Sequence, residues 1–312
     1  MRRRHVLLGG TALAAAALVG CSGGPLYDAS NAERDFPPIG SFAEVEGLRL
    51  HYWEQGDGPP VVLVHGASGN IRDWTFSIAP ELAKSFRVIA IDRPGFGYSQ
   101  RPSSLGWDPA VQARLMQGLT RQIGAERPVV VGHSWGGALA MSWALQFPEE
   151  TAGVIPVSGV TMPYGGLSRV FRALGLDGIL IEAYSNYVRR TAAEGGIDNF
   201  VSRAFRPQQP PEGYLAYVGP GLSLREATVV ANQLDIQNLN VALRRMEPVY
   251  GTLTMPVEIL HGTEDFISAN RHAVPLSQKI PQARLTLLSG VGHMAHHIRT
   301  DALKAAIERV VA

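Results

Sequence analysis

Residues 128–147 read PVVVGHSWGGALAMSWALQF, and the centre of this stretch, Gly132-His133-Ser134-Trp135-Gly136, decides the fold. An apolar run precedes it and a helix-compatible run follows it. A Gly-x-Ser-x-Gly turn between a strand and a helix is a nucleophile elbow, in which the serine takes a strained backbone conformation and its hydroxyl stands clear of the sheet. Glycine is needed on both sides because a Cβ at Gly132 or Gly136 would strike the neighbouring strand or helix. The stretch therefore predicts a nucleophile at Ser134.

A second apolar run lies upstream of the elbow. Val61–Val64 is continuously apolar, as a buried parallel strand is, and it ends in the glycine-containing loop His65–Gly69. Acyl transfer needs two N–H donors for the oxyanion. We expect one from the backbone of Trp135, directly after the nucleophile, and one from Ala67 in this loop. His65 is expected to organise hydrogen bonds in the loop without titrating in catalysis.

Two more stretches that are expected to form strands follow downstream. Val257–Leu260 leads into His261-Gly262-Thr263-Glu264-Asp265, and the run from Arg284 to Leu288 leads into Gly290-Val291-Gly292-His293. A serine hydroxyl is a poor nucleophile until a base takes its proton, which a histidine can do at neutral pH. A carboxylate fixes the tautomer of that histidine and stabilises its charged form. The chain thus offers nucleophile, acid and base in the order that α/β-hydrolases use.

At this point the sequence resembles the α/β-hydrolase superfamily over nearly all of residues 41–312. The resemblance implies a mostly parallel, eight-stranded sheet flanked by helices, with an inserted helical cap. It also implies Ser134 as nucleophile, His293 as general base and then acid, and Asp265 as the orienting carboxylate. Five motifs carry it: His65-Gly66, the run Asp92-Arg93-Pro94-Gly95-Phe96-Gly97-Tyr98-Ser99, the elbow, His261-Gly262-x-x-Asp265, and Gly292-His293.

Other residues compete for the acid and base roles. Glu264 competes with Asp265, but the spacing from the strand end favours Asp265 and leaves Glu264 solvated. His296 and His297 compete with His293, and we expect them on the first turn of the last helix. Three further polar residues at strand ends are expected to be structural: Asp92, His133 and His261.

The residue at the elbow narrows the chemistry. In the superfamily, haloalkane dehalogenases and most epoxide hydrolases carry aspartate there, and dienelactone hydrolases carry cysteine. Serine leaves acyl chemistry on esters, thioesters, lactones or amides, or cleavage of the C–C bond of a vinylogous diketone. No His-x-Glu-x-x-His-like spacing and no cysteine cluster occurs in the sequence, so we expect no metal and no cofactor.

We therefore expect a serine hydrolase that cleaves a carboxylic ester of a small or medium hydrophobic substrate through an acyl-enzyme intermediate. Two alternatives remain open on the same scaffold. One is a C–C bond hydrolase or cofactor-free perhydrolase that uses the same triad. The other is a non-catalytic lipoprotein that holds a ligand in the capped pocket.

The insertion expected to shape the pocket is the segment 160–248. About a hundred residues separate the strand that ends near Ser158 from Val257, far more than a plain crossover needs. Helical patterning and prolines within it predict a helical cap that excludes water. Helices are expected at 167–174, 179–190, 198–205, 224–235 and 241–247. Candidate substrate-contacting residues are Trp74, Trp107, Met162, Tyr164 and Tyr184, each of which has ordinary core packing as its alternative.

The N-terminus has the features of a targeting segment. Residues 1–20 combine three arginines with an apolar stretch too short to span a bilayer, and they predict a signal peptide. Leu18-Val19-Gly20-Cys21 resembles a bacterial lipoprotein processing site, so Cys21 is expected to carry a lipid. Arg3-Arg4 also resembles a twin-arginine signal. Residues 21–40 are expected to be a flexible tether, and the protein an exported lipoprotein of the bacterial cell envelope, held at the membrane through Cys21. The alternative is an ordinary cleaved signal.

Composition and length limit the classes of partner, the disulfides and the number of domains that the chain can have. Without the three arginines of residues 2–4, Lys plus Arg falls from 28 to 25 against 27 acidic residues, a balance near zero that does not suggest nucleic acid as a partner. A single cysteine allows no disulfide within the chain. The length suits one α/β core, residues 41–159 and 249–312, with the cap inserted. The oligomeric state is left open.

Overall fold

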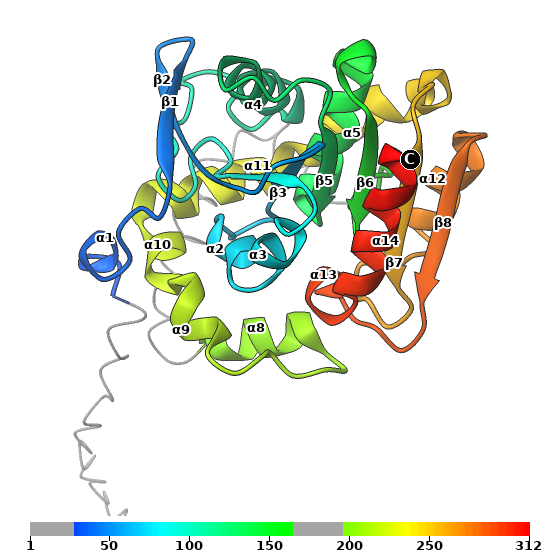
Figure 1. The fold of residues 1–312 in the computed structure, drawn as a ribbon. Coiled ribbons are helices and arrows are strands. Elements are labelled where there is room, and N and C mark those ends of the chain that lie inside the picture. The colour runs from blue at the N-terminus through cyan, green and yellow to red at the C-terminus, as the bar shows by residue number, and fades with distance from the viewer. Residues whose placement is uncertain (1–27, 165–195) are drawn as a thin grey trace, which may run out of the picture.

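The computed structural model describes residues 28–164 and 196–312. Eight strands form one sheet in the order β1-β2-β4-β3-β5-β6-β7-β8 (Figure 1). The hairpin β1-β2 pairs in antiparallel fashion and joins β4 antiparallel, whereas all pairs from β4 to β8 are parallel. The expected eight-stranded, mostly parallel sheet is therefore confirmed. The strands are β1 Ser41–Val45, β2 Leu48–Gln55, β3 Pro60–Val64, β4 Arg87–Ile91, β5 Val129–His133, β6 Gly153–Val157, β7 Val257–Gly262 and β8 Ala283–Leu288.

The central strands are apolar throughout because both faces of the sheet are covered. In β3, Val61 and Leu63 belong to one hydrophobic cluster, while Val62 and Val64 belong to the other. Side chains alternate between the two faces of a strand, so a strand buried on both sides reads as a continuous hydrophobic run. This explains why such runs in the sequence mark parallel strands here.

Helices pack on both faces of the sheet. Helices α4, α5, α11 and α12 contribute to one hydrophobic cluster, and α2, α3, α13 and α14 contribute to the other. Helix α4 begins with Pro109 directly after Asp108, whose side chain accepts a hydrogen bond from the Ala110 N–H. An aspartate cap followed by proline is a strong start signal for a helix. The bounds are α2 Arg72–Thr75, α3 Ile78–Leu82, α4 Pro109–Gln122, α5 Trp135–Gln146, α11 Glu226–Met246, α12 Ala273–Lys279, α13 Ala295–Ile298 and α14 Thr300–Val311.

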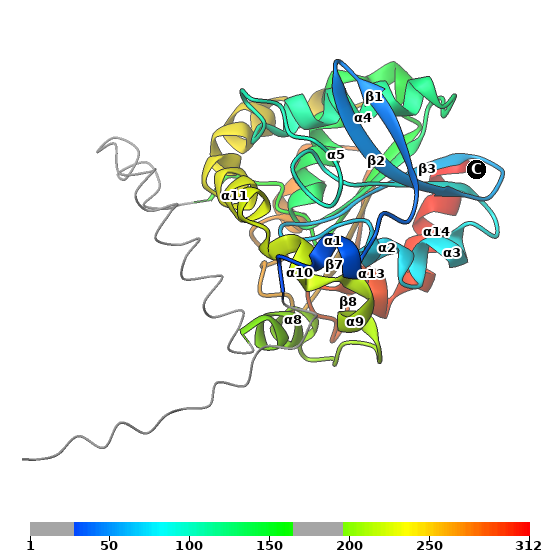
Figure 2. The same ribbon diagram turned by 90° about the vertical axis from the view of Figure 1, so that its left-hand side faces the viewer.

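The described part of the inserted segment is helical. Helices α8 Ile197–Phe205, α9 Tyr214–Val218 and α10 Pro220–Leu224 run along one side of the molecule and lead into the long helix α11 (Figure 2). The sequence predicted two helices, over 224–235 and 241–247, where α11 is a single helix. Its middle, Ile236–Asn240, contains no proline or glycine to interrupt it. The predicted helices at 167–174 and 179–190, together with Tyr184, lie outside the described residues.

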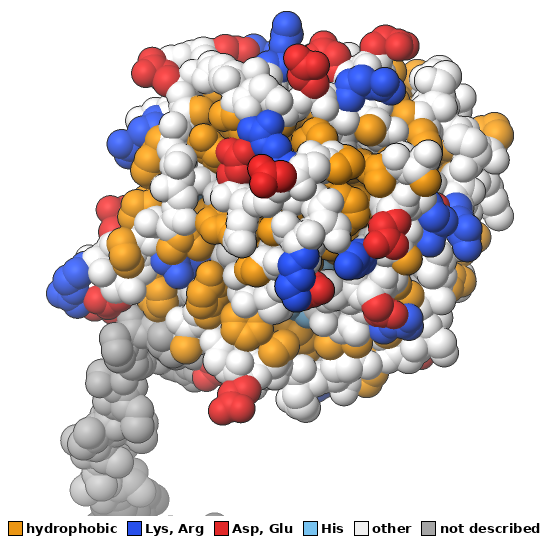
Figure 3. Space-filling model, viewed as in Figure 1, with side chains coloured by type: hydrophobic (Ala, Val, Ile, Leu, Met, Phe, Trp, Pro, Cys, Tyr) orange, Lys and Arg blue, Asp and Glu red, His pale blue; other side chains and the backbone are white. Residues whose placement is uncertain are grey.

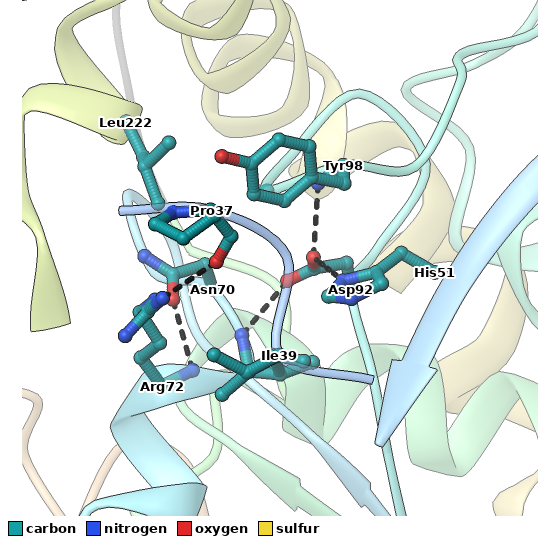
Figure 4. A pocket seen from close by; sticks show the side chains of 10 residues that line it. Pro37, Ile39, His51, Asn70, Arg72, Asp92, Tyr98 and Leu222 are labelled. Atoms are coloured by element: carbon teal, nitrogen blue, oxygen red, sulfur yellow. Dashed lines mark hydrogen bonds and ion pairs between the residues drawn. The ribbon is translucent and has the colours of Figure 1, made fainter. Parts of the chain in front are cut away.

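The segment before β1 packs against the core. Residues 28–40 fall within the predicted tether, yet they contain helix α1 Ala32–Asp35, and Ala32 and Phe36 are buried. The guanidinium of Arg72 donates to the Pro37 carbonyl at 2.7 Å (Figure 4), and the Tyr98 hydroxyl donates to the Phe36 carbonyl. The described part of the predicted tether is thus held by specific contacts, because its two apolar side chains find a place beside α10.

Asp92 organises the small pocket beneath this segment. Its carboxylate accepts hydrogen bonds from the backbone N–H groups of Ile71 and Tyr98, and it lies 2.7 Å from His51 Nδ1 (Figure 4). These contacts connect the residue after β4 to β2, to the residue before α2 and to the turn that contains Tyr98. Asp92 therefore has a structural position.

The surface drawn in Figure 3 carries acidic and basic side chains interspersed among hydrophobic ones. Within residues 28–164 and 196–312, no helix is both long enough and apolar enough to span a membrane. The predicted signal peptide and Cys21 lie outside the described residues.

Candidate active site

The parallel strands bring their carboxyl ends to one edge of the sheet, and the predicted catalytic residues follow those ends. Ser134 follows β5, Asp265 follows β7, and His293 lies in the loop after β8. Ligands and catalytic groups of open α/β sheets gather at this edge because the loops there converge. Residues separated by more than 150 positions are thereby placed in one site.

The elbow has the strained geometry that its sequence predicts. Ser134 adopts φ 54° and ψ −117°, in the left-handed region that non-glycine residues seldom occupy. A Cβ added at Gly132 would lie 2.0 Å from the Gly136 carbonyl oxygen, and one added at Gly136 would lie 2.6 Å from the Val64 oxygen. Both contacts are impossible, so the turn tolerates only glycine at these positions. The Ser134 side chain itself stays partly exposed.

His293 is paired with Asp265. Its Nδ1 lies 2.9 and 3.0 Å from the two carboxylate oxygens of Asp265. The same carboxylate accepts the backbone N–H of Ile267 at 2.7 Å and lies 3.2 Å from His261 Nε2. Burial alone would raise the pKa of Asp265, but the hydrogen bonds with His261 and His293 outweigh it and hold that pKa well below its usual range. Glu264 is exposed to solvent and His297 and His296 pair with Asp73 instead.

His133 links the elbow to the histidine loop. Its Nε2 lies 3.1 Å from the backbone carbonyl oxygen of His293, and the two rings are 4.8 Å apart. Since His133 directly precedes Ser134, this contact fixes the histidine loop against the nucleophile. The other side of His293 meets Phe266, at 4.5 Å between ring centroids, and Phe266 is 52% exposed. No motif in the sequence marks Phe266, because its contact with His293 depends on the fold of the loop after Asp265.

The loop that carries Ala67 is held by the cap. The Ser68 N–H donates to the Asn232 side-chain oxygen at 2.8 Å, and the Ser223 hydroxyl donates to the Ser68 carbonyl at 2.7 Å. A Cβ at Gly66 would approach Ser134 Cβ to 3.1 Å, so the loop lies directly against the nucleophile. The position of Ala67 therefore depends on side chains of α10 and α11, which sequence spacing does not relate to this loop.

A buried ionic cluster joins the elbow to the same cap helix. Arg93 donates to Asp235 at 3.0 Å, and Arg101 donates to the other oxygen of that carboxylate at 2.7 Å. The Arg93 guanidinium lies over the Trp135 ring at 3.9 Å, and Trp135 Nε1–H donates to the Asp235 carbonyl at 3.2 Å. Burial lowers the pKa of Arg93 to about 10, which leaves the side chain charged at neutral pH. Asp235 of α11 thus positions both Arg93 and the residue after the nucleophile.

Asp235→Asn should lower the free energy of unfolding by about 3–5 kcal/mol, because it leaves two arginines facing an uncharged amide in a buried place. Equilibrium urea unfolding measures this loss. Glu81→Gln is the matched control, since it breaks the exposed Lys84–Glu81 pair and should cost less than about 1 kcal/mol. Equal, small losses in the two variants would contradict the role given to Asp235.

His65 is a buried, uncharged part of the oxyanion loop. Its Nε2 accepts the backbone N–H of Arg93 at 3.0 Å, while its Nδ1 lies 2.9 Å from the Gly66 carbonyl oxygen. Burial, reinforced by the charge of Arg93, lowers the pKa of His65 to about 4. A protonated ring would lose the acceptor that holds Arg93. The expected structural role of His65 agrees with these bonds.

Stability should fall as the pH falls from about 6.5 towards about 4. The unfolded chain binds a proton at His65 in this window and the folded chain does not, so protonation favours unfolding by at most about 3 kcal/mol. Urea unfolding of the protein and of His65→Gln, measured from about pH 7.5 to about pH 4.5, tests this. In His65→Gln, the number of protons taken up on unfolding, given by the slope of the unfolding free energy against pH, should fall by up to one. Identical slopes in the protein and the variant would contradict the prediction.

The predicted substrate-contacting residues are found in different surroundings. Trp74 is fully buried, and its ring lies 4.6 Å from that of His296, which matches its alternative as a core residue. The Met162 N–H donates to His272 Nδ1 at 3.1 Å. Tyr164 exchanges backbone hydrogen bonds with the Asn240 side chain on α11, and Trp107 lies beside Arg245 of the same helix.

Comparison with known proteins agrees with the observed fold. The family model described as alpha/beta hydrolase fold matches residues 59–300. The 2-hydroxymuconate semialdehyde hydrolase of Pseudomonas sp. (strain CF600) is 27% identical over 267 residues, which are 84% of this chain and 90% of that protein. Haloalkane dehalogenase 2 of Mycobacterium tuberculosis (strain ATCC 25618 / H37Rv) is 26% identical over 273 residues, 83% of this chain and 90% of that protein.

A solved structure shares the fold. The thermophilic esterase from Thermogutta terrifontis superposes with a TM-score of 0.71 at 23% identity, covering 88% of this chain and all of that one. This likeness concerns the fold. The chain is therefore similar to hydrolases with different reactions. The residue at the elbow and its surroundings are the features that discriminate among these reactions.

Proposed function

Because the chain belongs to the alpha/beta hydrolase fold family, we propose that it is a serine hydrolase that cleaves a carboxylic ester through an acyl-enzyme intermediate. The observation that carries the proposal is the occurrence, at the same edge of the sheet, of a strained Ser134 and of a histidine, His293, whose Nδ1 is bonded to the buried carboxylate of Asp265. That arrangement leaves Nε2 of His293 to accept a proton.

The proposed reaction has two steps. His293 Nε2 takes the Ser134 proton as Oγ attacks the ester carbonyl carbon, and the N–H groups of Ala67 and Trp135 stabilise the oxyanion. The tetrahedral intermediate collapses, and the alcohol leaves with the proton from His293. Water then attacks the acyl-enzyme with the same histidine as base, which releases the acid and restores Ser134.

The nucleophile argues against a dehalogenase activity despite the similarity to haloalkane dehalogenase 2. Displacement of halide by an enzyme carboxylate requires aspartate at the elbow, and this chain has Ser134. A small or medium hydrophobic substrate is supported by Phe266, which offers an exposed aromatic ring against His293. Such a ring favours apolar groups next to the scissile bond.

C–C bond hydrolysis is the second candidate, and the similarity to the 2-hydroxymuconate semialdehyde hydrolase favours it. The same base and oxyanion donors suit attack on the carbonyl of a vinylogous diketone. Turnover of such a diketone at a rate above that of every ester tested would select this candidate. A cofactor-free perhydrolase would instead form peracid from a carboxylic acid and peroxide.

The test of the proposal is hydrolysis of p-nitrophenyl esters with short to long acyl chains. We expect turnover with an optimum at short or medium length, together with labelling of Ser134 by a fluorophosphonate. The proposal would be overturned if the folded protein hydrolysed neither esters nor diketones and was not labelled by the fluorophosphonate. That result would favour the ligand-binding alternative.

We also propose that the protein is exported and anchored to a membrane of the bacterial cell envelope through a lipid on Cys21. The basic start, the short apolar stretch and the lipoprotein-like site at Leu18–Cys21 support this. In a bacterial host given a radiolabelled fatty acid, the protein should carry label in the membrane fraction and Cys21→Ala should carry none. Equal labelling of both would overturn the proposal.

A further inference from the structure

Behind the catalytic histidine lies a buried histidine cluster, formed by Asp73, His133, His296 and His297. Nε2 of His296 lies 3.1 Å from one oxygen of Asp73, and Nε2 of His297 lies 2.8 Å from the other. The rings of His133 and His296 are 4.2 Å apart. Asp73 belongs to α2, whereas His296 and His297 belong to α13, so these hydrogen bonds join the two helices. No motif in the sequence relates these residues.

The spacing of the cluster suits a metal ion. One nitrogen of His133, one nitrogen of His296 and one oxygen of Asp73 lie within 4.8 Å of one another. Tetrahedral ligands at Zn–N and Zn–O distances near 2.1 Å are separated by roughly 3.3 Å. The Asp73–His296 pair already lies near that separation, so closing the site requires a shift of His133 by on the order of 1 Å.

The surroundings of the cluster resemble those of a metal site. The Tyr214 hydroxyl donates to Asp73 at 2.7 Å, and a hydrogen bond from His133 Nε2 to the His293 carbonyl would leave Nδ1 with a free lone pair. Ligating histidines commonly donate their second nitrogen to a backbone carbonyl in this way. Among the residues that the structure describes, Nδ1 of His296 and Nδ1 of His297 are buried and have no hydrogen-bond partner, so within the cluster this second hydrogen bond is seen at His133.

We propose that Asp73, His133 and His296 bind one divalent transition-metal ion of the Zn²⁺ class. Imidazole nitrogens and a carboxylate oxygen are typical ligands of Zn²⁺. The ion balances the charge of Asp73, which otherwise faces only imidazole and hydroxyl groups in the contacts described above. Side chains of Trp74 and Phe205 enclose the histidines.

The ion acts on the active site through His133, a part of the inference that rests on the proposed hydrolase function. Drawing His133 towards Asp73 strains its bond to the His293 carbonyl and displaces the catalytic ring from Ser134. Zn²⁺ is thus a reversible inhibitor of this enzyme. Chelation restores turnover because the hydrogen-bonded arrangement of the cluster re-forms.

Titration of the full, tag-free chain with Co²⁺ tests the site, because tetrahedral Co²⁺ absorbs visible light. We expect absorption that saturates at one ion per chain and is displaced by Zn²⁺. Tyr214→Phe, which removes a hydrogen bond to Asp73 and no ligand, should weaken binding by about 10–100-fold. Asp73→Asn and His296→Gln should abolish the absorption, while His272→Gln, a change in a histidine outside the cluster, should leave it intact.

Absence of saturable Co²⁺ absorption in the unmodified chain overturns the proposal whether or not any variant folds. So does absorption that survives in folded Asp73→Asn and His296→Gln, because the ion would then be bound elsewhere. Inhibition of ester hydrolysis is a separate readout. Metal binding that leaves ester hydrolysis unchanged supports the site and overturns its coupling to His293. If the chain has no hydrolase activity, the Co²⁺ titration still decides whether the metal site exists.

Discussion

Ser134→Ala should lower kcat for ester hydrolysis on the order of 10⁶-fold, the loss that removal of a triad nucleophile produces. The hydroxyl oxygen forms the bond to the acyl carbon, so no neighbouring group can replace it within the same mechanism. Substrate binding should change far less, because the oxyanion donors and the surrounding apolar side chains remain. Kinetics with a p-nitrophenyl ester, together with an equilibrium binding measurement on the inactive variant, separates these two effects.

The matched control for this variant is Ser142→Ala, which removes the hydroxyl of a buried serine two turns further along α5. The Ser142 hydroxyl lies near the side chain of Gln146 on the same helix, so its loss should leave turnover nearly unchanged. Near-normal turnover in Ser134→Ala would show that Ser134 is not the nucleophile. It would also remove the basis for an acyl-enzyme intermediate.

The core of the fold could be predicted because its signals are local. Val61–Val64 is a continuous apolar run and proved to be a strand covered on both faces. Val257–Leu260 is apolar except for Glu258, and its apolar side chains belong to both hydrophobic clusters. The elbow was predictable for the same reason, since the Gly-x-Ser-x-Gly turn encodes its own steric requirement. Motif order then indicated which strand ends meet, and Asp265 and His293 lie together as the resemblance implied.

The contacts that organise the site could not be predicted, because they join residues far apart in the chain. Asp235 meets Arg93 across 142 positions, and Asp73 meets His296 across 223. Arg93 belongs to a motif, but Asp235, Asp73 and His296 do not. The period of a helical segment such as α11 does not show which of its polar residues points into the core. The break expected within α11 also failed to appear: α11 is one continuous helix that packs against α4 and α5.

The cap contacts each of the three loops that carry the proposed machinery. Asn232 holds the loop of Ala67, Asp235 holds Trp135 after the nucleophile, and Gln208 accepts the Gly292 N–H beside His293 at 3.2 Å. The partner from the inserted segment is a side-chain carboxamide in two of these contacts and the Asp235 backbone carbonyl in the third. The described residues of the inserted segment therefore help to fix the positions of the proposed catalytic residues.

Asp265→Asn should lower kcat by about 10⁴-fold while leaving the fold intact. The asparagine amide has nearly the same shape, but its N–H₂ group facing Nδ1 of His293 favours the tautomer whose proton is on Nε2, where the base must be free. It also removes the charge that stabilises the imidazolium. Steady-state kinetics measures the loss, and circular dichroism with urea unfolding checks the fold.

Glu264→Gln is the control that isolates position 265, because it removes a neighbouring carboxylate that is exposed. It should retain turnover within about twofold, since exposed charges interact weakly with a buried site. The low pKa of Asp265 adds a second test: its carboxylate stays ionised far into the acid range, so protonation of Asp265 should not contribute to the acid limb of the pH–activity profile. A large loss in Glu264→Gln with a small one in Asp265→Asn would transfer the carboxylate role to Glu264.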